Sequence, residues 1–441
     1  MFPYPHYFSA TLFLLAVPSA AQNRPPSGIF ADRIARSVES HQVAALDYRH
    51  RIHQDPELGN REFETAKLVA EHLRSLSMVV RTGVAHTGVV GVLKGGKDGP
   101  VIAVRADMDA LPVSEDTDLR FKSTKRGTYN GQEVGIMHAC GHDIHTAVQM
   151  GVASVLTDLQ QDIPGTVLFV FQPAEEGPPE GEEGGANLML EEGVFDDPRP
   201  EAVFGLHTLA DLPVGQIGFT EGPALAAVDH FKATVKGTQT HGAQPHQGVD
   251  PIVMASQVVL ALQTIASRNL DPLQPVVVTV GMFHGGERFN IIPAQVHLEG
   301  TVRTYDPDVR NTVERRMGEI LDGITRAGGG SYTLDYQRGT PATINDPELT
   351  QWMVPSVAAV VGEGGVIDLK PTMGGEDFAY YANEVPGFFY RLGTLKEGTV
   401  SGPHHSPTFR ADDAAVPIGM RVMTNVLLDY LFRRSQGSRP E

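Results

Sequence analysis

The most concentrated chemistry of this chain lies around Cys140, the only cysteine among 441 residues. His142 follows two positions later, and Gly141 between them permits a tight backbone. In a loop or extended segment, side chains at this spacing can converge on one metal ion, and thiolate and imidazole are both common ligands. A buried free cysteine beside unrelated histidines has the same local sequence. The interpretation as a metal site therefore depends on motifs elsewhere in the chain.

Pairs of carboxylates follow two predicted strands. The apolar run 101–104 leads into Asp107 and Asp109, and the run 166–171 leads into Glu175 and Glu176. Open α/β sheets build their sites beyond the carboxyl ends of parallel strands. Adjacent glutamates in extended backbone point to opposite sides, so one can bind a metal while the other reaches a metal-held water. Together these roles would suit hydrolysis, although solvated acidic turns have the same local sequence.

Further histidines stand where they could join the same rim of the sheet. His207 follows the apolar strand 203–206, and His404 and His405 lie in a turn-prone loop. His145 falls in the first turn of the helix after Cys140, where it faces either the site or solvent. Taken singly, each histidine is also consistent with an ordinary core or surface residue. Taken together, they indicate a shared site.

The elements that must position these groups alternate between strand and helix. Periods of three and four residues predict helices, and short β-branched runs predict buried strands. The predicted helices are 29–51, 62–75, 143–159, 186–192, 349–361 and 412–432, and the strands are 89–93, 101–104, 166–171 and 202–206. This alternation favours an α/β fold with a mostly parallel sheet flanked by helices. We assign residues 29–224 and 337–435 to this catalytic, metal-binding domain.

Between these two parts the pattern changes to strand, helix, strand, strand, helix, strand. The predicted segments are 229–236, 250–267, 276–282, 295–305, 308–327 and 331–337. This order is the split βαβ pattern of a compact α+β domain. Residues 225–336 are therefore predicted to form an inserted domain.

The inserted segment carries polar groups of its own. His241, Asn290 and Arg303 offer imidazole, amide and guanidinium donors. Such donors suit a carbonyl oxyanion or a free carboxylate. Ordinary polarity of surface loops is the alternative explanation.

Composition and the amino terminus narrow the class of protein. The formal net charge of −18 disfavours nucleic acid as a partner, because an acidic surface repels phosphate. Residues 1–21 contain a short apolar run followed by small residues and are predicted to be a signal peptide. The mature protein is then exported, periplasmic or secreted, with no membrane attachment. If the segment is not a signal, the protein is expected to be cytoplasmic. A single cysteine excludes an internal disulfide framework.

Taken together, these motifs resemble those of a known family. The chain is similar to the aminoacylase and carboxypeptidase superfamily of metal hydrolases, and within it to the branch of hippurate, N-acyl amino acid and auxin-conjugate hydrolases. The matching blocks are residues 53–57, 105–112, 137–146, 172–177, 205–208, 241–252, 373–378 and 405–407. They span nearly the whole chain after the predicted signal peptide.

The resemblance implies a role for each candidate residue. The implied metal ligands are Cys140, His142, Glu176, His207 and His405, with Cys140 bridging two ions. Glu175 is the implied general base, Asp109 orients a ligand, and His241 polarises the scissile carbonyl. Asn290 and Arg303 are the implied contacts of the substrate carboxylate, and His404 is a bystander.

The resemblance also implies the activity. We expect a metal-dependent enzyme with two zinc or manganese ions that hydrolyses small N-acyl amino acids to a carboxylic acid and an amino acid. The first alternative is a dipeptidase or carboxypeptidase of the same superfamily. A non-catalytic, metal-dependent binding protein is the second. In relatives the inserted domain acts as a lid and dimerises, so His241 is expected to serve the neighbouring subunit of a homodimer.

Overall fold

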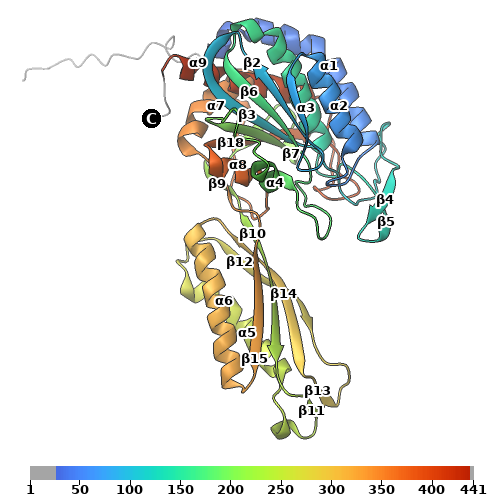
Figure 1. The fold of residues 1–441 in the computed structure, drawn as a ribbon, viewed down its shortest axis with the longest axis vertical. Coiled ribbons are helices and arrows are strands. Elements are labelled where there is room, and N and C mark those ends of the chain that lie inside the picture. Colours follow the sequence, from blue (N-terminus) through green and yellow to red (C-terminus); the bar gives the residue numbers. More distant parts are fainter. Residues whose placement is uncertain (1–25, 438–441) are drawn as a thin grey trace, which may run out of the picture.

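The computed structural model describes residues 26–437, which form a larger α/β unit and an elongated second unit (Figure 1). The predicted signal peptide, residues 1–21, lies outside the described residues. Among residues 26–437, none of the helices combines the length and apolar composition that a membrane span requires.

The larger unit is built on an eight-stranded sheet with the order β1-β2-β6-β3-β7-β18-β8-β17. The strands are β1 (Val79–Val84), β2 (Gly88–Lys94), β3 (Lys97–Asp107), β6 (Pro164–Gln172), β7 (Val203–Pro213), β8 (Ile217–Phe219), β17 (Val366–Asp368) and β18 (Gly387–Leu395). Strands β6, β3, β7 and β18 run parallel to one another at its centre. The predicted fold class is therefore confirmed.

Helices cover both faces of this sheet. The larger hydrophobic core lies on the face covered by α1 (Ala31–Gln54), α2 (Phe63–Ser75), α3 (His142–Asp158), α7 (Pro347–Val361) and α9 (Ala415–Ser435). The smaller core lies on the opposite face, covered by α4 (Gly185–Glu191) and α8 (Phe378–Glu384). Strand β6 is apolar throughout because it contributes to both cores: Val167 and Phe169 enter the larger one, and Leu168 and Val170 enter the smaller one.

Several elements are absent from the sequence prediction. The most central is β18, which lies between β7 and β8. Others are β1, β8, β17, the helix α8, the hairpin of β4 (Arg126–Tyr129) and β5 (Gln132–Gly135), the pair β9 (Gly222–Leu225) and β16 (Thr343–Asn345), and two short strands of the second unit, β11 (Thr240–His241) and β13 (Ile291–Ile292). Because β9 and β16 pair with each other, the two chain crossings into the second unit lie side by side.

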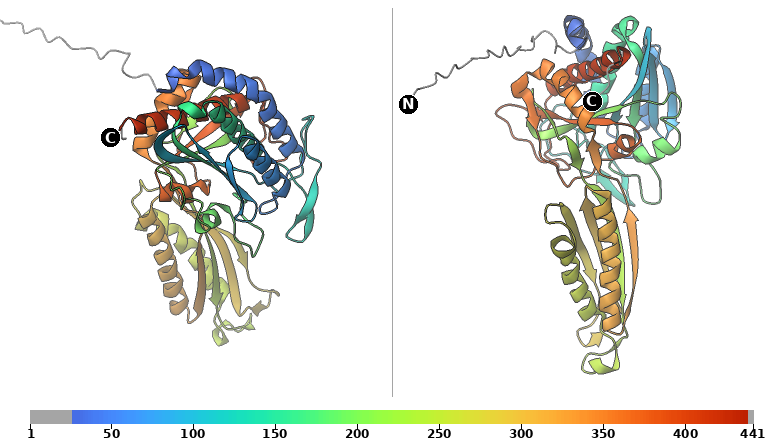
Figure 2. Two further views of the ribbon diagram at one scale, coloured as in Figure 1. Left: turned by 45° about the horizontal axis from the view of Figure 1, so that its top comes forward. Right: turned by 90° about the vertical axis from the view of Figure 1, so that its left-hand side faces the viewer.

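The second unit has the predicted order of strands and helices. Its elements are β10 (Ala227–Lys236), α5 (Pro251–Thr264), β12 (Val276–His284), β14 (Gln295–Thr304), α6 (Pro307–Ala327) and β15 (Ser331–Arg338). The strands form an antiparallel sheet in the order β12-β14-β10-β15, with α5 and α6 packed on one face (Figure 2). Asp250 and Asp306 cap the two helices, and proline follows each cap.

A short pair of strands, β11 (Thr240–His241) and β13 (Ile291–Ile292), forms the tip of this unit farthest from the larger sheet (Figure 1). Domain boundaries at 225 and 336, and the role of the unit as a lid, remain predictions.

Candidate metal centre

The parallel strands bring the candidate residues to one edge of the sheet. Asp107 ends β3, Gln172 ends β6, and His207 lies within β7, paired in register with Arg391 of β18. Cys140 and Gly141 precede α3, which begins at His142. Segments far apart in sequence therefore meet at the carboxyl ends of the central strands, as expected for an α/β site.

Gly141 permits the close spacing of cysteine and histidine. Its φ of 87° lies in the left-handed region, which residues other than glycine rarely adopt. A Cβ atom here would also stand 2.4 Å from Oγ1 of Thr208. That hydroxyl donates a hydrogen bond of 2.8 Å to the Cys140 carbonyl, which secures the loop against β7.

The Cys140 sulfur stands at the centre of the cluster. Its Sγ atom lies 3.3 Å from Nε2 of His207 and 3.3 Å from Nε2 of His405. Nε2 of His405 also lies 3.0 Å from Oε1 of Glu176. Nε2 of His142 is 3.9 Å from Oε2 of Glu175 and 4.0 Å from Oε1 of Glu176. The structure thus brings together the five predicted ligands and the predicted base.

These donors fit two metal ions. One group is Cys140, His142 and His207, and another is Cys140, Glu176 and His405; in each, the ligand atoms lie within 4.8 Å of one another. The two groups share the sulfur. Nε2 of His142 is buried without a hydrogen-bond partner, which costs free energy unless a cation binds there. Thiolate, imidazole and carboxylate together suit zinc, and imidazole with carboxylate suits manganese as well.

Asp109 links two members of the cluster from behind. Its Oδ1 atom lies 3.2 Å from Nδ1 of His142, and its Oδ2 atom accepts a hydrogen bond of 3.0 Å from the Glu176 amide. Burial acts to lower the pKa of His142, but Asp107 and Asp109 more than offset it and raise that pKa well above its ordinary value. A carboxylate in this position fixes the orientation of a ligating imidazole.

Glu175 occupies an acidic and almost fully buried position. Burial raises its pKa well above the ordinary value, and the carboxylates of Glu376, Glu176 and Asp377 act in the same direction. Nearby divalent cations would act in the opposite direction. Its Oε1 atom accepts a hydrogen bond of 3.4 Å from the Asp377 amide, so the start of α8 orients this side chain.

A buried arginine balances the acids around Glu175. The Arg105 guanidinium lies 2.6 Å from Asp107, 3.0 Å from Glu376 and 2.7 Å from Asp377. All four residues belong to blocks that resemble the family, but the sequence alone assigned no role to this arginine. The sequence did contain a signal for this role, because Arg105 directly follows the apolar run of a predicted buried strand, and a cation is buried only when it is paired with acidic groups.

His145 faces the buried interior and has both ring nitrogens occupied. Nδ1 lies 2.5 Å from Oδ1 of Asp107, and Nε2 accepts a hydrogen bond of 2.8 Å from the Thr208 amide. Because neither nitrogen is free, this histidine supports the site from behind.

His404 is nearer to the cluster than the sequence suggested. Nδ1 lies 3.6 Å from the Cys140 sulfur, while Nε2 accepts a hydrogen bond of 3.2 Å from the Ala210 amide. His405 alone of the two contacts both Cys140 and Glu176. The geometry therefore favours His405 as the ligand, with His404 as a wall of the same cavity.

A cavity of about 750 Å³ opens in front of the cluster. Its walls include Cys140, Glu175, Glu176, His207 and His405. Three cationic side chains also line it: Arg303 from β14 of the second unit, Lys370, and Arg391 from β18. The structure thus places predicted residue Arg303 in the cavity of its own chain.

The remaining two predicted residues lie elsewhere. His241 is exposed in β11, and the amide of Gly242 donates a hydrogen bond of 2.8 Å to the Asn290 carbonyl, so the two residues are neighbours. They lie at the tip of the second unit (Figure 1). Within the described chain they are therefore not part of the metal cluster.

Comparison with known proteins agrees with this architecture. A family model described as peptidase family M20/M25/M40 matches residues 103–429, so the chain belongs to this family. It is 41% identical over 373 residues to an N-acetyl-L-cysteine deacetylase of Bacillus subtilis, covering 84% of each chain. It is also 36% identical to thermostable carboxypeptidase 1 of Saccharolobus solfataricus, covering 88% of this chain and 95% of the relative.

One solved structure bears on the metals. A dinuclear metal-binding peptidase of the M20 family from Bacillus subtilis superposes with a TM-score of 0.75 at 34% identity, covering 89% of this chain and 99% of the other. The resemblance drawn from the sequence motifs is therefore confirmed at the level of the family.

Proposed function

We propose that this protein is a metal-dependent amidohydrolase that cleaves N-acyl amino acids with two divalent ions. The observation that carries the proposal is the convergence of five candidate metal ligands in one cluster, four of which line a cavity that also holds Glu175 and three cations. The similarity to an N-acetyl-L-cysteine deacetylase supports the same substrate class.

Each group then has a chemical task. A divalent ion supplies Lewis acidity, which lowers the pKa of water and polarises a carbonyl. Glu175 takes the proton of the attacking water and later delivers it to the leaving amine. Asp109 keeps His142 and Glu176 oriented. Arg303 lies where a guanidinium can pair with the substrate carboxylate.

Replacing the base tests this assignment. Glu175→Gln should lower kcat by about a thousandfold, because general base catalysis of this kind contributes 10²–10⁴-fold. Hydrolysis of N-acetyl and N-benzoyl amino acids would be followed with zinc-loaded and manganese-loaded enzyme, and bound metal would be counted by mass spectrometry.

Glu183→Gln provides the matched control, since Glu183 lies exposed in the loop after Glu176. It should retain full activity. Wild-type turnover in the Glu175 variant would refute the assigned base, and loss of its metal would make Glu175 a ligand instead.

An exopeptidase is the second candidate, favoured by the 36% identity to a thermostable carboxypeptidase. Both reactions release a free amino acid from an amide, so the same cavity serves either. Comparing kcat/KM for N-acyl amino acids with that for dipeptides and longer peptides separates the two.

A homodimer through the second unit would complete the site. Strand β12 lies at the edge of its sheet, and large apolar side chains are exposed on α5 and β12: Val253, Leu260, Met282 and Phe283. An apolar helix face beside an unpaired edge suits a second copy of the same surface. We propose that such a dimer brings His241 and Asn290 to the cavity of the neighbouring subunit.

Export is a separate proposal, because it rests on residues 1–21. Cleavage after Ala21 would leave Gln22 as the first residue of the mature protein. Amino-terminal sequencing of protein from its native cell tests this, and an intact Met1 would contradict it.

A further inference from the structure

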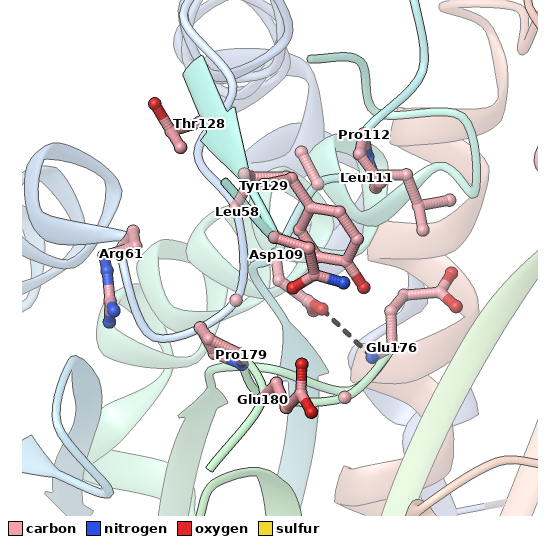
Figure 3. A pocket seen from close by; sticks show the side chains of 14 residues that line it. Leu58, Arg61, Asp109, Leu111, Pro112, Thr128, Tyr129, Glu176, Pro179 and Glu180 are labelled. Carbon is pink, nitrogen blue, oxygen red and sulfur yellow. Dashed lines mark hydrogen bonds between the residues drawn. The ribbon is translucent and has the colours of Figure 1, made fainter. Parts of the chain in front are cut away.

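A second cavity adjoins the first at Glu176, the one described residue that lines both. It has a volume of about 380 Å³, within the range of small-molecule sites (~300–1,000 Å³). Leu58, Leu111 and Pro112 supply apolar walls, and Asp109 and Glu176 border both this cavity and the metal cluster (Figure 3). A substrate whose carbonyl lies at the cluster can therefore extend in two directions.

A hairpin closes this second cavity. Strands β4 and β5 pair with Tyr129 opposite Gln132, leaving Asn130 and Gly131 as a two-residue turn. Both turn residues have positive φ, 48° and 74°, as a type I′ turn requires. The base of the hairpin is held where the Ile136 amide donates 3.0 Å to the Lys125 carbonyl. The turn of this hairpin is thus preorganised and is not a flexible loop.

Tyr129 is the aromatic group that this hairpin presents. Figure 3 shows its ring projecting from the strand into the cavity, near Asp109 and Leu111. The residue is 38% exposed, so part of its ring is accessible to a ligand. Its position suits stacking against a planar or apolar group.

Charge separates the two cavities. The first contains Arg303, Lys370 and Arg391, none of which forms an ion pair with a described residue. Of its carboxylates, Glu376 and Asp377 are paired with Arg105, Glu175 and Glu176 belong to the metal cluster, and Asp211 is exposed.

The second cavity has the opposite character. It is bordered by Asp109, Glu176 and Glu180, and its one arginine, Arg61, is paired with Glu182 at 2.5 Å. A substrate carboxylate can therefore pair with a cation in the first cavity, whereas the lining of the second offers carboxylates and no unpaired cation.

From this asymmetry we propose that the second cavity is the acyl subsite and that Tyr129 selects neutral, apolar acyl groups, aromatic ones above all. This inference rests on the proposed function and adds to it the chemical class of the acyl group. Glu180 at the rim disfavours acyl groups that carry a second carboxylate.

The test compares three glycine amides in the metal-loaded enzyme: N-benzoylglycine, N-acetylglycine and N-succinylglycine. Tyr129→Ala should lower kcat/KM for the benzoyl substrate about tenfold, because it removes one aromatic contact and the apolar area that the contact buries. The value of kcat/KM for the acetyl substrate should stay nearly unchanged. Tyr129→Phe should keep the benzoyl preference. Glu180→Gln should raise activity on the succinyl substrate alone.

Gln132→Ala is the matched control, because Gln132 faces Tyr129 across the turn but does not line the cavity. It should behave as wild type. An unchanged ratio of benzoyl to acetyl activity in Tyr129→Ala, or an equal loss on both, would overturn the subsite.

If the wild type cleaves no N-acyl amino acid, the proposed function is refuted independently of the subsite. The subsite is then decided by calorimetric binding of benzoate to the metal-loaded protein. Weaker binding in Tyr129→Ala than in Gln132→Ala supports the subsite, and equal binding refutes it.

Discussion

At the scale of single residues, the site depends on side chains that do not themselves reach a substrate. Asp109 contacts both the His142 ring and the Glu176 amide, so one carboxylate orients one ligand at the start of α3 and another in the loop after β6. Gly141 is equally constrained, because its positive φ and the nearby Thr208 hydroxyl leave no room for a side chain. The positions of Cys140 and His142 thus depend on neighbouring residues that are harder to recognise as functional in the sequence.

We predict that Asp109→Asn weakens metal binding by about 10–100-fold, the usual cost of removing such a carboxylate. The measurement is metal retention during titration with a chelator. Asp211→Asn should change nothing, since Asp211 lines the cavity but is exposed and contacts no candidate ligand. Equal affinities for Asp109→Asn and wild type would show that Asp109 is not an orienting group.

At the scale of elements, a buried ionic joint ties α1 to the start of α3. His53 of α1 lies 2.9 Å from Asp143 and 3.2 Å from Glu115, and Arg49 lies 3.2 Å from Asp143. Burial acts to lower the pKa of His53, but Asp143 and Glu115 outweigh it and raise the pKa from 6.5 to about 9. The joint therefore keeps a charged histidine in the core beside the metal-binding helix.

This joint predicts a pH dependence of stability. Because the folded pKa lies above the unfolded value, the stabilisation is complete below about pH 6.5 and is lost as pH rises through about 9. The difference in unfolding free energy between wild type and His53→Gln should shrink by about 3 kcal/mol over that interval. Urea unfolding of metal-free protein at pH 6 and pH 9.5 measures it. Exposed His86→Gln is the control, and a constant difference for His53→Gln would contradict the prediction.

The elements of the structure that were not predicted from the sequence include the strand β18 and the β4–β5 hairpin. Strand β18 has the apolar composition of a buried strand, yet no predicted element covered it, because its partners β7 and β8 are contributed by distant parts of the chain. The β4–β5 hairpin was likewise missed, although Asn130-Gly131 is a strong turn signal. Its strands are short and half polar, so the periodicity on which the prediction relied is weak there.

At the scale of the whole molecule, the positions of His241 and Asn290 decide whether one chain suffices. They lie at the tip formed by β11 and β13, the end of the second unit that is farthest from the larger sheet (Figure 1). Arg303 of the same unit instead lines the cavity of its own chain. Under the proposed dimer, each site combines Glu175 of one subunit with the partner subunit's His241.

Mixing two inactive variants tests this directly. Glu175→Gln and His241→Ala, unfolded together and refolded, should recover about a quarter of wild-type activity, since half of random dimers are mixed and each then holds one intact site. Each variant refolded alone should stay inactive, and sedimentation should show dimers. Absence of recovery in mixed dimers would place both groups in one subunit or remove His241 from the reaction.

The sequence by itself determined the fold class, the family and the set of metal-binding residue types, because strand and helix periodicities and motif spacing are local properties. It did not determine which atoms meet. The pairing of Asp109 with both His142 and Glu176, the neutralisation of Glu376 and Asp377 by Arg105, and the cavity beneath Tyr129 arise only when distant strands are placed in register. Distances of a few ångströms between such residues depend on tertiary packing, which local sequence patterns do not encode.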